Sequence, residues 1–463
     1  MNRYLNNQYC KFFILLGFLI SITYSIFIIN KYDQNYLTQD KSKIEHYLIK
    51  GDVEDYFNIA FNFNNDLKKK SFFYSGREYT ASYLHPKIIS FFFIILDKEI
   101  RIKSNSARID NNGYIFNINN NKFIFLLFQT LLYYSSIFFF YKKTQNKVNT
   151  KILNIVILFL SIEPTLIQWN SSFMTESIFL SLLLFLISFL INANTSKIKN
   201  LFIGIIIGTM YAQRTVAIFL IAPIFLYYFF YFKNIKIILK NSFFIIIGQA
   251  VILIFIGYHN YTRSEIFYIT PWQSKIAGYY YAADNIKAKG DNVNSAIISE
   301  ERLKKEKEWV KGNNIQMNLE KDRLKLYDYQ QKYFLKILNN YPLESFKYFA
   351  YKSAQTLILD PVYTYSIINI DLTVPKYWKT DDFKKMLIIK IIYSLVIYMV
   401  CFYGFLHSFK NLNHSLIILF GSFAVYFLIM LGWVGVTRYS VPILMCLSIF
   451  FANGIVSLKV IKP

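Results

Sequence analysis

Acidic residues are scarce in this chain, because 28 Asp and Glu stand against 51 Lys and Arg and leave a formal net charge of +23. Cysteine is scarcer still, with three residues in 463. Since Cys10, Cys401 and Cys446 lie inside or beside apolar segments, no disulfide framework is expected. The five histidines are scattered without the spacing of metal ligands, so the sequence predicts no metal site.

The positive charge does not predict a nucleic-acid partner. Lys, Asn, Ile, Tyr and Phe are abundant together, a pattern that biased codon usage would produce. Lysines beside membrane spans also attract anionic lipid headgroups. The sequence contains no basic helix or aromatic platform typical of a nucleic-acid module. We therefore expect membrane lipids as partners and no nucleic acid.

Apolar residues make up 54% of the chain and aromatic residues 19%, which is too much for an ordinary soluble protein. Several windows reach the roughly 18–20 apolar residues that cross a bilayer as a helix. The expected spans lie near residues 12–29, 122–141, 152–169, 173–192, 201–213, 215–232, 241–258, 386–407, 414–432 and 439–458. The predicted fold is an all-α polytopic membrane protein with about ten or more transmembrane helices. The apolar segment 86–96 is too short to span and is predicted to be re-entrant or interfacial.

The lysines predict the orientation in the membrane. With the N-terminus inside, each short inner connection is basic, whereas each short outer connection carries at most one basic residue. The inner lysines are Lys142, Lys143, Lys147, Lys151, Lys197, Lys199, Lys233, Lys236, Lys240, Lys410, Lys459 and Lys462. Five parts follow: a first transmembrane helix (1–30), an outer loop with an acidic motif and a re-entrant segment (31–121), a transmembrane bundle (122–258), an outer helical subdomain (259–385) and C-terminal transmembrane helices (386–463).

Within the second outer part, a charged run precedes a long amphipathic segment. Apolar residues at helical spacing predict a helix from about Leu324 to Leu359, interrupted near Tyr341-Pro342. Such a helix is expected to lie on the bundle or in the membrane interface.

The first outer part contains the acidic stretch Gly51–Ala60. On a helix Asp52 and Tyr56 share one face, and Asp55 points to a neighbouring face. A carboxylate just outside a membrane span is suited to act as the general base of a sugar transfer. The alternative is a solvated acidic loop or a helix N-terminus, where acidic residues are favoured.

Three further polar positions lie at the outer ends of expected spans. Glu176 either caps the helix that it opens or helps to shape a catalytic pocket. Arg214 lies between two apolar helices and is suited either to bidentate phosphate contact or to snorkelling toward headgroups. Arg438 and Tyr439 precede the last span, where they either flank a lipid phosphate or anchor the interface.

Taken in order, these motifs resemble the integral-membrane glycosyltransferases of the GT-C fold, in the family of protein O-mannosyltransferases and of the aminoarabinose and galacturonic-acid transferases acting on lipid A. The matching stretches are Asp52-x-x-x-Tyr56-x-x-x-Ala60, Tyr83-Leu84-His85-Pro86, Thr175-Glu176, Arg214 after a helix with Gly204 and Gly208, and Arg438-Tyr439-x-x-Pro442, with a weaker match at Asn340-Tyr341-Pro342 and Lys352. The chain departs from the family at His85 and Thr215, where proline is common, and in the 98–121 insert.

The resemblance implies a GT-C-like architecture and a mechanism. A polyprenyl-phosphate sugar donor would enter from the bilayer with its phosphate near Arg214 and Arg438. Asp52, helped by Asp55 or Glu176, would activate an acceptor hydroxyl for a single inversion. The substrate-binding residues implied are Tyr56, Tyr83, His85, Arg214, Arg438 and Tyr439. Some members of the family use a divalent cation, so the cofactor stays open. The implied location is a bacterial inner membrane with the active site facing the exterior.

Two other classes of function remain as alternatives. Transporters and lipid flippases place ionisable residues in mid-span, whereas here the polar candidates gather at one face and no inverted repeat is visible. A polymerase or ligase of polyprenyl-linked glycans would also use outer arginines, but the acidic first-loop motif argues against it.

Overall fold

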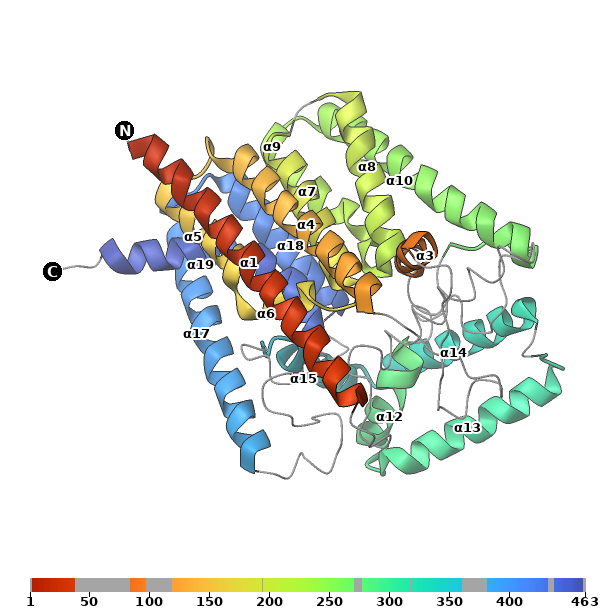
Figure 1. Cartoon of the computed structure of the whole chain (residues 1–463). Coiled ribbons are helices and arrows are strands. Elements are labelled where there is room, and N and C mark those ends of the chain that lie inside the picture. The colour runs from red at the N-terminus through yellow and green to blue at the C-terminus, as the bar shows by residue number, and fades with distance from the viewer. Residues whose placement is uncertain are drawn as a thin grey trace. The chain divides into compact units, whose positions relative to one another are not determined.

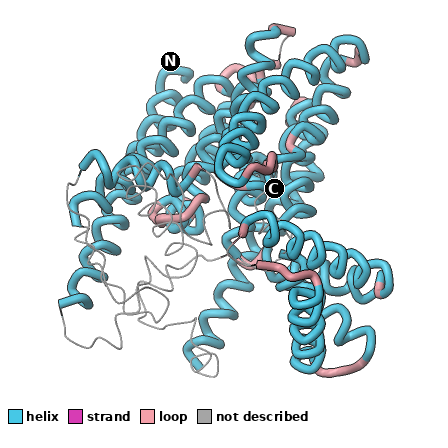
Figure 2. Tube along the Cα trace, turned by 90° about the vertical axis from the view of Figure 1, so that its right-hand side faces the viewer, coloured by secondary structure: helices cyan, strands magenta, loops and turns pink. Residues whose placement is uncertain are grey.

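The computed structural model describes residues 2–37, 84–96, 119–193, 195–269, 277–316, 319–359, 381–431 and 437–460. Most of these residues are helical, and no strand occurs within these ranges (Figures 1 and 2). The all-α prediction is therefore confirmed for the described part of the chain. Internal contacts divide the chain into two units, and two of the boundaries between them fall within helices, after Ser188 and after Phe383.

In the first unit, the described helices are α1 (Asn2–Leu37), α3 (His85–Leu96), α4 (Asn119–Thr144), α5 (Thr150–Ile162), α6 (Pro164–Asn170) and most of α7 (Glu176–Ile191). Helix α1 packs along both α4 and α5. Cys10 Sγ donates to Asn154 Oδ1 over 2.9 Å, and the hydroxyls of Ser21 and Tyr134 are 2.8 Å apart. Since Cys10 meets the first turns of α5, the α4–α5 connection lies at the same end of this unit as the start of α1.

A bend of 47° separates α5 from α6, where the sequence predicts one straight span over 152–169. Pro164 has no N–H with which to close a helical bond to the carbonyl of Leu160. The buried Tyr133 hydroxyl donates to that carbonyl instead, over 2.9 Å. Glu163 accepts a bond of 2.7 Å from the backbone N–H of Leu166 and so caps α6. Side chains thus take over the backbone bonds that the bend removes, as a membrane interior requires.

The Tyr133→Phe variant is expected to lose about 1–3 kcal/mol of stability, because the Leu160 carbonyl would stay buried without its donor. Unfolding of the purified protein in mixed micelles, followed by circular dichroism, measures the change. Tyr258→Phe is the matched control, since the Tyr258 side chain is 62% exposed. Equal destabilisation by the two substitutions would contradict the role of the hydroxyl at the bend.

In the second unit, the apolar helices are α8 (Lys197–Gln213), η1 (Thr215–Phe219), α9 (Ile221–Phe232), α10 (Ile235–Ser264), α17 (Asp381–Asn411), α18 (His414–Leu431), η5 (Thr437–Ser440) and α19 (Val441–Val460). Helices α8 and α10 lie side by side (Figure 1). A Cβ atom at Gly204 would overlap the carbonyl of Ile245, and one at Gly248 would overlap that of Leu201. Glycine is therefore required for this close approach of two backbones.

The rest of the second unit is the helical subdomain, formed by η2 (Tyr279–Ala283), α12 (Asp284–Asp291), α13 (Ser295–Gly312), α14 (Glu320–Asn340) and α15 (Pro342–Thr356). The predicted interruption is confirmed, because α14 ends before Tyr341 and Pro342 opens α15. The apolar face of α14 packs in the core of this subdomain rather than on a membrane bundle. The core contains Ala282, Ala283, Ile286, Ile337 and Tyr348, with Tyr333, Phe334, Leu338 and Tyr341 packed against them.

Fewer helices qualify as spans than the ten expected from the sequence. In the described ranges seven are long and apolar enough to cross a membrane, or eight if α5 and α6 form one bent span. Helix α7 is a shorter apolar helix, and α8, with 17 residues, also falls short of a full span. At 12 residues α3 is only about 18 Å long, as expected for a segment that does not cross. These helices are those of an integral membrane protein.

Candidate functional site

Four of the predicted site residues lie outside the described residues: Asp52, Asp55, Tyr56 and Tyr83. Their roles stay predictions. The structure describes the other five, His85 and Glu176 in the first unit and Arg214, Arg438 and Tyr439 in the second.

Arg214 is the single residue between α8 and η1. Its backbone is extended (φ −149°, ψ 125°), which ends α8, while its N–H still donates to the carbonyl of Met210 over 2.7 Å. Its carbonyl accepts from the N–H of Ala217 over 3.1 Å and so starts η1. Arg214 is therefore held at both sides by helical hydrogen bonds, at the first end of the apolar segment Thr215–Phe232.

Arg438 and Tyr439 lie on η5, the 3-10 turn that leads into α19. Both side chains are half-buried. Arg438 Nη2 donates to the hydroxyl of Tyr439 over 3.2 Å. The two residues thus stand at the first end of the apolar segment Arg438–Leu458.

The two arginines, more than two hundred positions apart in the sequence, meet at the ring of Tyr439. The Cζ atom of Arg214 lies 4.8 Å from the ring centroid and that of Arg438 lies 5.0 Å from it, both within the range of cation–π attraction. The two guanidinium groups are therefore no more than about 10 Å apart, close to one Debye length in physiological salt. This arrangement concentrates positive charge where two apolar segments begin. We call Arg214, Arg438 and Tyr439 the arginine cluster.

Helix α18 packs against both segments that carry this cluster. It packs against both η1 and η5, and also against α9 and α19. The buried hydroxyl of Tyr426 on α18 donates to the carbonyl of Val216, the second residue of η1. A single helix therefore sets the positions of Arg214 and Arg438 relative to each other.

In the first unit, Glu176 and His85 share a buried polar region. Helix α7 begins at Glu176, as predicted, and this carboxyl group is 1% exposed at a helix N-terminus that favours negative charge. Thr175 Oγ1 donates to Glu176 Oε2 over 3.4 Å. His85 Nε2 lies 2.8 Å from the carbonyl of Phe173, so the start of α3 is fixed to the segment that precedes α7.

His85 is wholly buried. Burial lowers the pKa of His85 to about 4, although the bond to Phe173 and the charge of Glu176 act in the opposite direction. The imidazole is therefore neutral at pH 7. In this position it contacts the backbone of its own unit, and its substrate-binding role stays a prediction.

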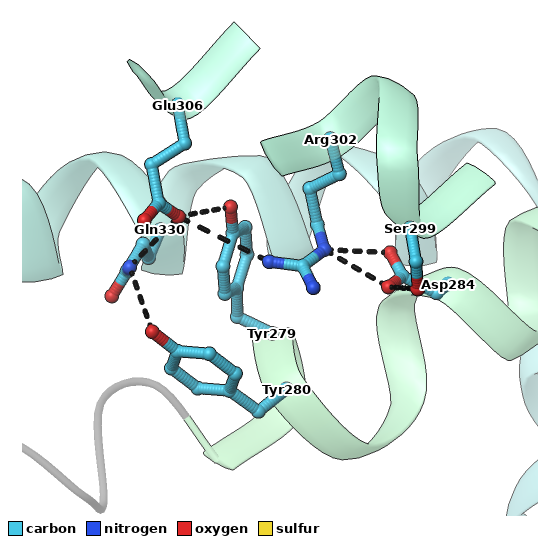
Figure 3. Close-up of polar contacts among 7 residues, drawn as sticks. All are labelled: Tyr279, Tyr280, Asp284, Ser299, Arg302, Glu306 and Gln330. Carbon is cyan, nitrogen blue, oxygen red and sulfur yellow. Dashed lines mark hydrogen bonds and ion pairs between the residues drawn. The ribbon is translucent and has the colours of Figure 1, made fainter. Parts of the chain in front are cut away.

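The helical subdomain contains a polar network that was not predicted from the sequence (Figure 3). Arg302 Nε on α13 donates to both carboxylate oxygens of Asp284, over 2.8 and 2.9 Å, and Ser299 donates to the same group. The guanidinium of Arg302 also stacks 4.3 Å from the ring centroid of Tyr279. Tyr279 in turn donates to Glu306. Burial and the bond to Glu306 raise the pKa of the Tyr279 phenol, so that it remains a donor.

This network serves structure rather than chemistry. Gln330 Nε2 on α14 donates to Glu306 over 3.0 Å, so the network joins η2, α12, α13 and α14. Asp284 accepts three hydrogen bonds from two donors, Ser299 and Arg302, and both Asp284 and Arg302 are buried. Arg302 lies 18 residues after Asp284, in a run rich in lysine and glutamate, so sequence spacing alone could not identify it as the charge partner of Asp284.

Glu163 is a second residue that spacing failed to single out. A Glu-Pro pair inside an apolar segment was the available signal, because proline bends a helix and glutamate can cap the new N-terminus. In the described ranges, no group of three or more His, Cys, Asp or Glu side chains is arranged to hold a metal ion. Comparison of the sequence with known protein families and with curated proteins finds no match, so the chemistry of the site has to be argued from its own residues.

Proposed function

We propose that this chain is a glycosyltransferase that moves a sugar from a polyprenyl-phosphate donor to a hydroxyl group of a lipid, glycan or protein acceptor. The observation that carries the proposal is the arginine cluster, in which two guanidinium groups converge on one tyrosine ring. Guanidinium groups bind phosphate oxygens in pairs of parallel hydrogen bonds. The cluster is thus suited to hold the phosphate of a lipid-linked donor where two apolar segments begin.

The cluster suits the leaving group of this reaction. The acceptor oxygen attacks the anomeric carbon while the bond from that carbon to the phosphate oxygen breaks. The electron pair stays on the phosphate, whose charge becomes more negative by one. Two fixed cations stabilise the charge that develops on the leaving phosphate more strongly than they stabilise the intact donor. This difference lowers the activation barrier.

A carboxylate takes the proton of the acceptor hydroxyl in this scheme. Asp52 is proposed for that role on the resemblance of its motif, with Asp55 or Glu176 in support. The basic inner connections support an orientation in which the reaction takes place on the outer face, in a bacterial inner membrane. The GT-C architecture is part of the same proposal.

Two measurements test this function. Mass spectrometry of envelope glycolipids and glycoproteins, with and without the gene, is expected to reveal one species that lacks a single sugar. The purified chain in proteoliposomes, given the matching polyprenyl-phosphate sugar and that acceptor, is then expected to release free polyprenyl phosphate. An unchanged envelope together with no released carrier would refute the proposal. Transbilayer movement of the donor without any sugar transfer would favour a flippase instead.

A further inference from the structure

One face of helix α15 is exposed and mostly apolar. Leu343, Phe346 and Tyr351 are exposed by 59%, 69% and 56%, and Ala350 is exposed between them. These residues recur at helical spacing and form a single stripe. Tyr348, on the opposite side of α15, is buried in the core of the helical subdomain. Side chains of this size in one exposed stripe indicate an interaction surface.

The helix that carries the stripe packs against the apolar helices of its own unit. Helix α15 contacts η5 and α18, which belong to the membrane part of the same unit. Just beyond α15, the N–H of Leu359 donates to the hydroxyl of Ser394 over 2.8 Å. Ser394 lies seven residues inside the apolar segment Leu387–Asn411, which corresponds to about 10 Å along that helix. The residues that directly follow α15 therefore contact α17 within the first turns of its apolar segment.

Cations border the stripe. Lys352 Nζ lies 5.6 Å and Lys289 Nζ lies 5.8 Å from the ring centroid of Tyr351. Lys347 is exposed on the stripe itself and pairs with Glu344 over 3.3 Å, on an exposed site where such a pair contributes little. Three lysines against one glutamate leave this surface positive. Aromatic and aliphatic side chains edged by lysines are typical of helices that lie in a lipid headgroup layer.

We propose that the exposed face of α15 docks on anionic lipid headgroups of the membrane that holds the apolar helices. Leu343, Phe346 and Tyr351 enter the boundary between headgroups and acyl chains, and the lysines contact the lipid phosphates. The docked helix would fix the subdomain at the membrane surface. This inference concerns membrane attachment and does not depend on sugar transfer.

Spin-label accessibility in the full chain tests the proposal. The three native cysteines are buried, so a nitroxide at Ala350→Cys reports the stripe without removing its large side chains. Ala296→Cys, at an exposed position of α13, is the matched control. In vesicles of phosphatidylcholine and phosphatidylglycerol, the label at position 350 should collide with oxygen more, and with a water-soluble nickel chelate several-fold less, than the label at position 296. Equal accessibility at the two positions would overturn the proposal.

Two further experiments test whether the charge of the lipid headgroups protects position 350 from the nickel chelate. Pure phosphatidylcholine vesicles, and the substitution Lys347→Gln, should each raise nickel collisions at position 350, whereas Lys304→Gln on α13 should not. Identical profiles in neutral and anionic vesicles would reject recognition of anionic headgroups. Spin–spin broadening at position 350 that disappears on dilution with unlabelled protein would show that a second copy covers the face, which would also overturn the proposal.

Discussion

Arg214→Ala is expected to reduce sugar transfer about 10²- to 10³-fold, the usual cost of removing one donor that faces a developing anion. The reason is geometric: Arg214 is one of two guanidinium groups on the Tyr439 ring, and the remaining Arg438 cannot surround a phosphate alone. Arg214→Lys should retain part of the activity, because a lysine keeps the charge but loses the bidentate contact. Initial rates of polyprenyl phosphate release measure each variant.

Arg323→Ala is the control for this experiment, since it removes an arginine from the partly exposed face of α14. It should leave the rate of transfer unchanged. If Arg214→Ala and Arg214→Lys were both as active as the wild type, a role in holding the donor phosphate would be rejected. Equal loss in the Arg323 variant would point to a general effect of net charge on lipid binding.

Asp52→Asn separates the chemical step from donor binding. As the proposed base, Asp52 should be essential for transfer, while binding of the polyprenyl-phosphate donor should persist because the arginine cluster is intact. Equilibrium binding of the labelled donor, measured beside the transfer rate, distinguishes the two effects. Retained transfer would move the role of base to Asp55 or end the carboxylate hypothesis.

Arg302→Met is expected to have the largest effect on folding. It leaves the buried carboxylate of Asp284 without its charge partner, which costs about 3–5 kcal/mol in comparable buried pairs. Because the network joins four elements of the helical subdomain (Figure 3), the loss should appear as local opening of that subdomain. Hydrogen exchange in α12, α13 and α14 should accelerate by about two to three orders of magnitude, since 1.4 kcal/mol corresponds to tenfold.

Two further variants isolate the cause of that loss. Lys304→Met removes an exposed charge from the same helix and should leave the exchange rates unchanged. The double variant Arg302→Met with Asp284→Leu removes both buried charges and should recover most of the protection, because the buried carboxylate is gone and Glu306 keeps its bonds from Tyr279 and Gln330. A double variant as unstable as Arg302→Met would mean that packing against Tyr279, rather than charge, holds the network.

The sequence predicted the helices well where local signals are strong. Long apolar runs located the spans near 215–232, 414–432 and 439–458, and Pro342 located the break before α15. In the described ranges seven or eight of the ten expected spans are long enough to qualify, because apolar content alone does not reveal how far a helix extends. Helix α7 begins only at Glu176, and the run over 152–169 bends at Pro164.

The site was predicted residue by residue, but its geometry was not. Arg214 and Arg438 were both expected near a phosphate, and the structure places them on one ring. That meeting depends on α18, which packs against η1 and η5. These are tertiary contacts, and no regular residue spacing in the sequence predicts them. The same reason explains why the Arg302–Asp284 pair was missed. The acidic motif at Asp52 and Asp55 lies outside the described residues and stays a prediction.

The backbone contact between α8 and α10 has a consequence for the selectivity of the proposed transferase toward its donor. Gly204 and Gly248 bring the two helices into backbone contact, so the backbone of Arg214 at the end of α8 is expected to move only together with α10. Arg438 stands on one short turn of 3-10 helix. Any widening of the gap between the two guanidinium groups, such as a diphosphate carrier in place of a monophosphate would demand, must therefore come from the side of α19.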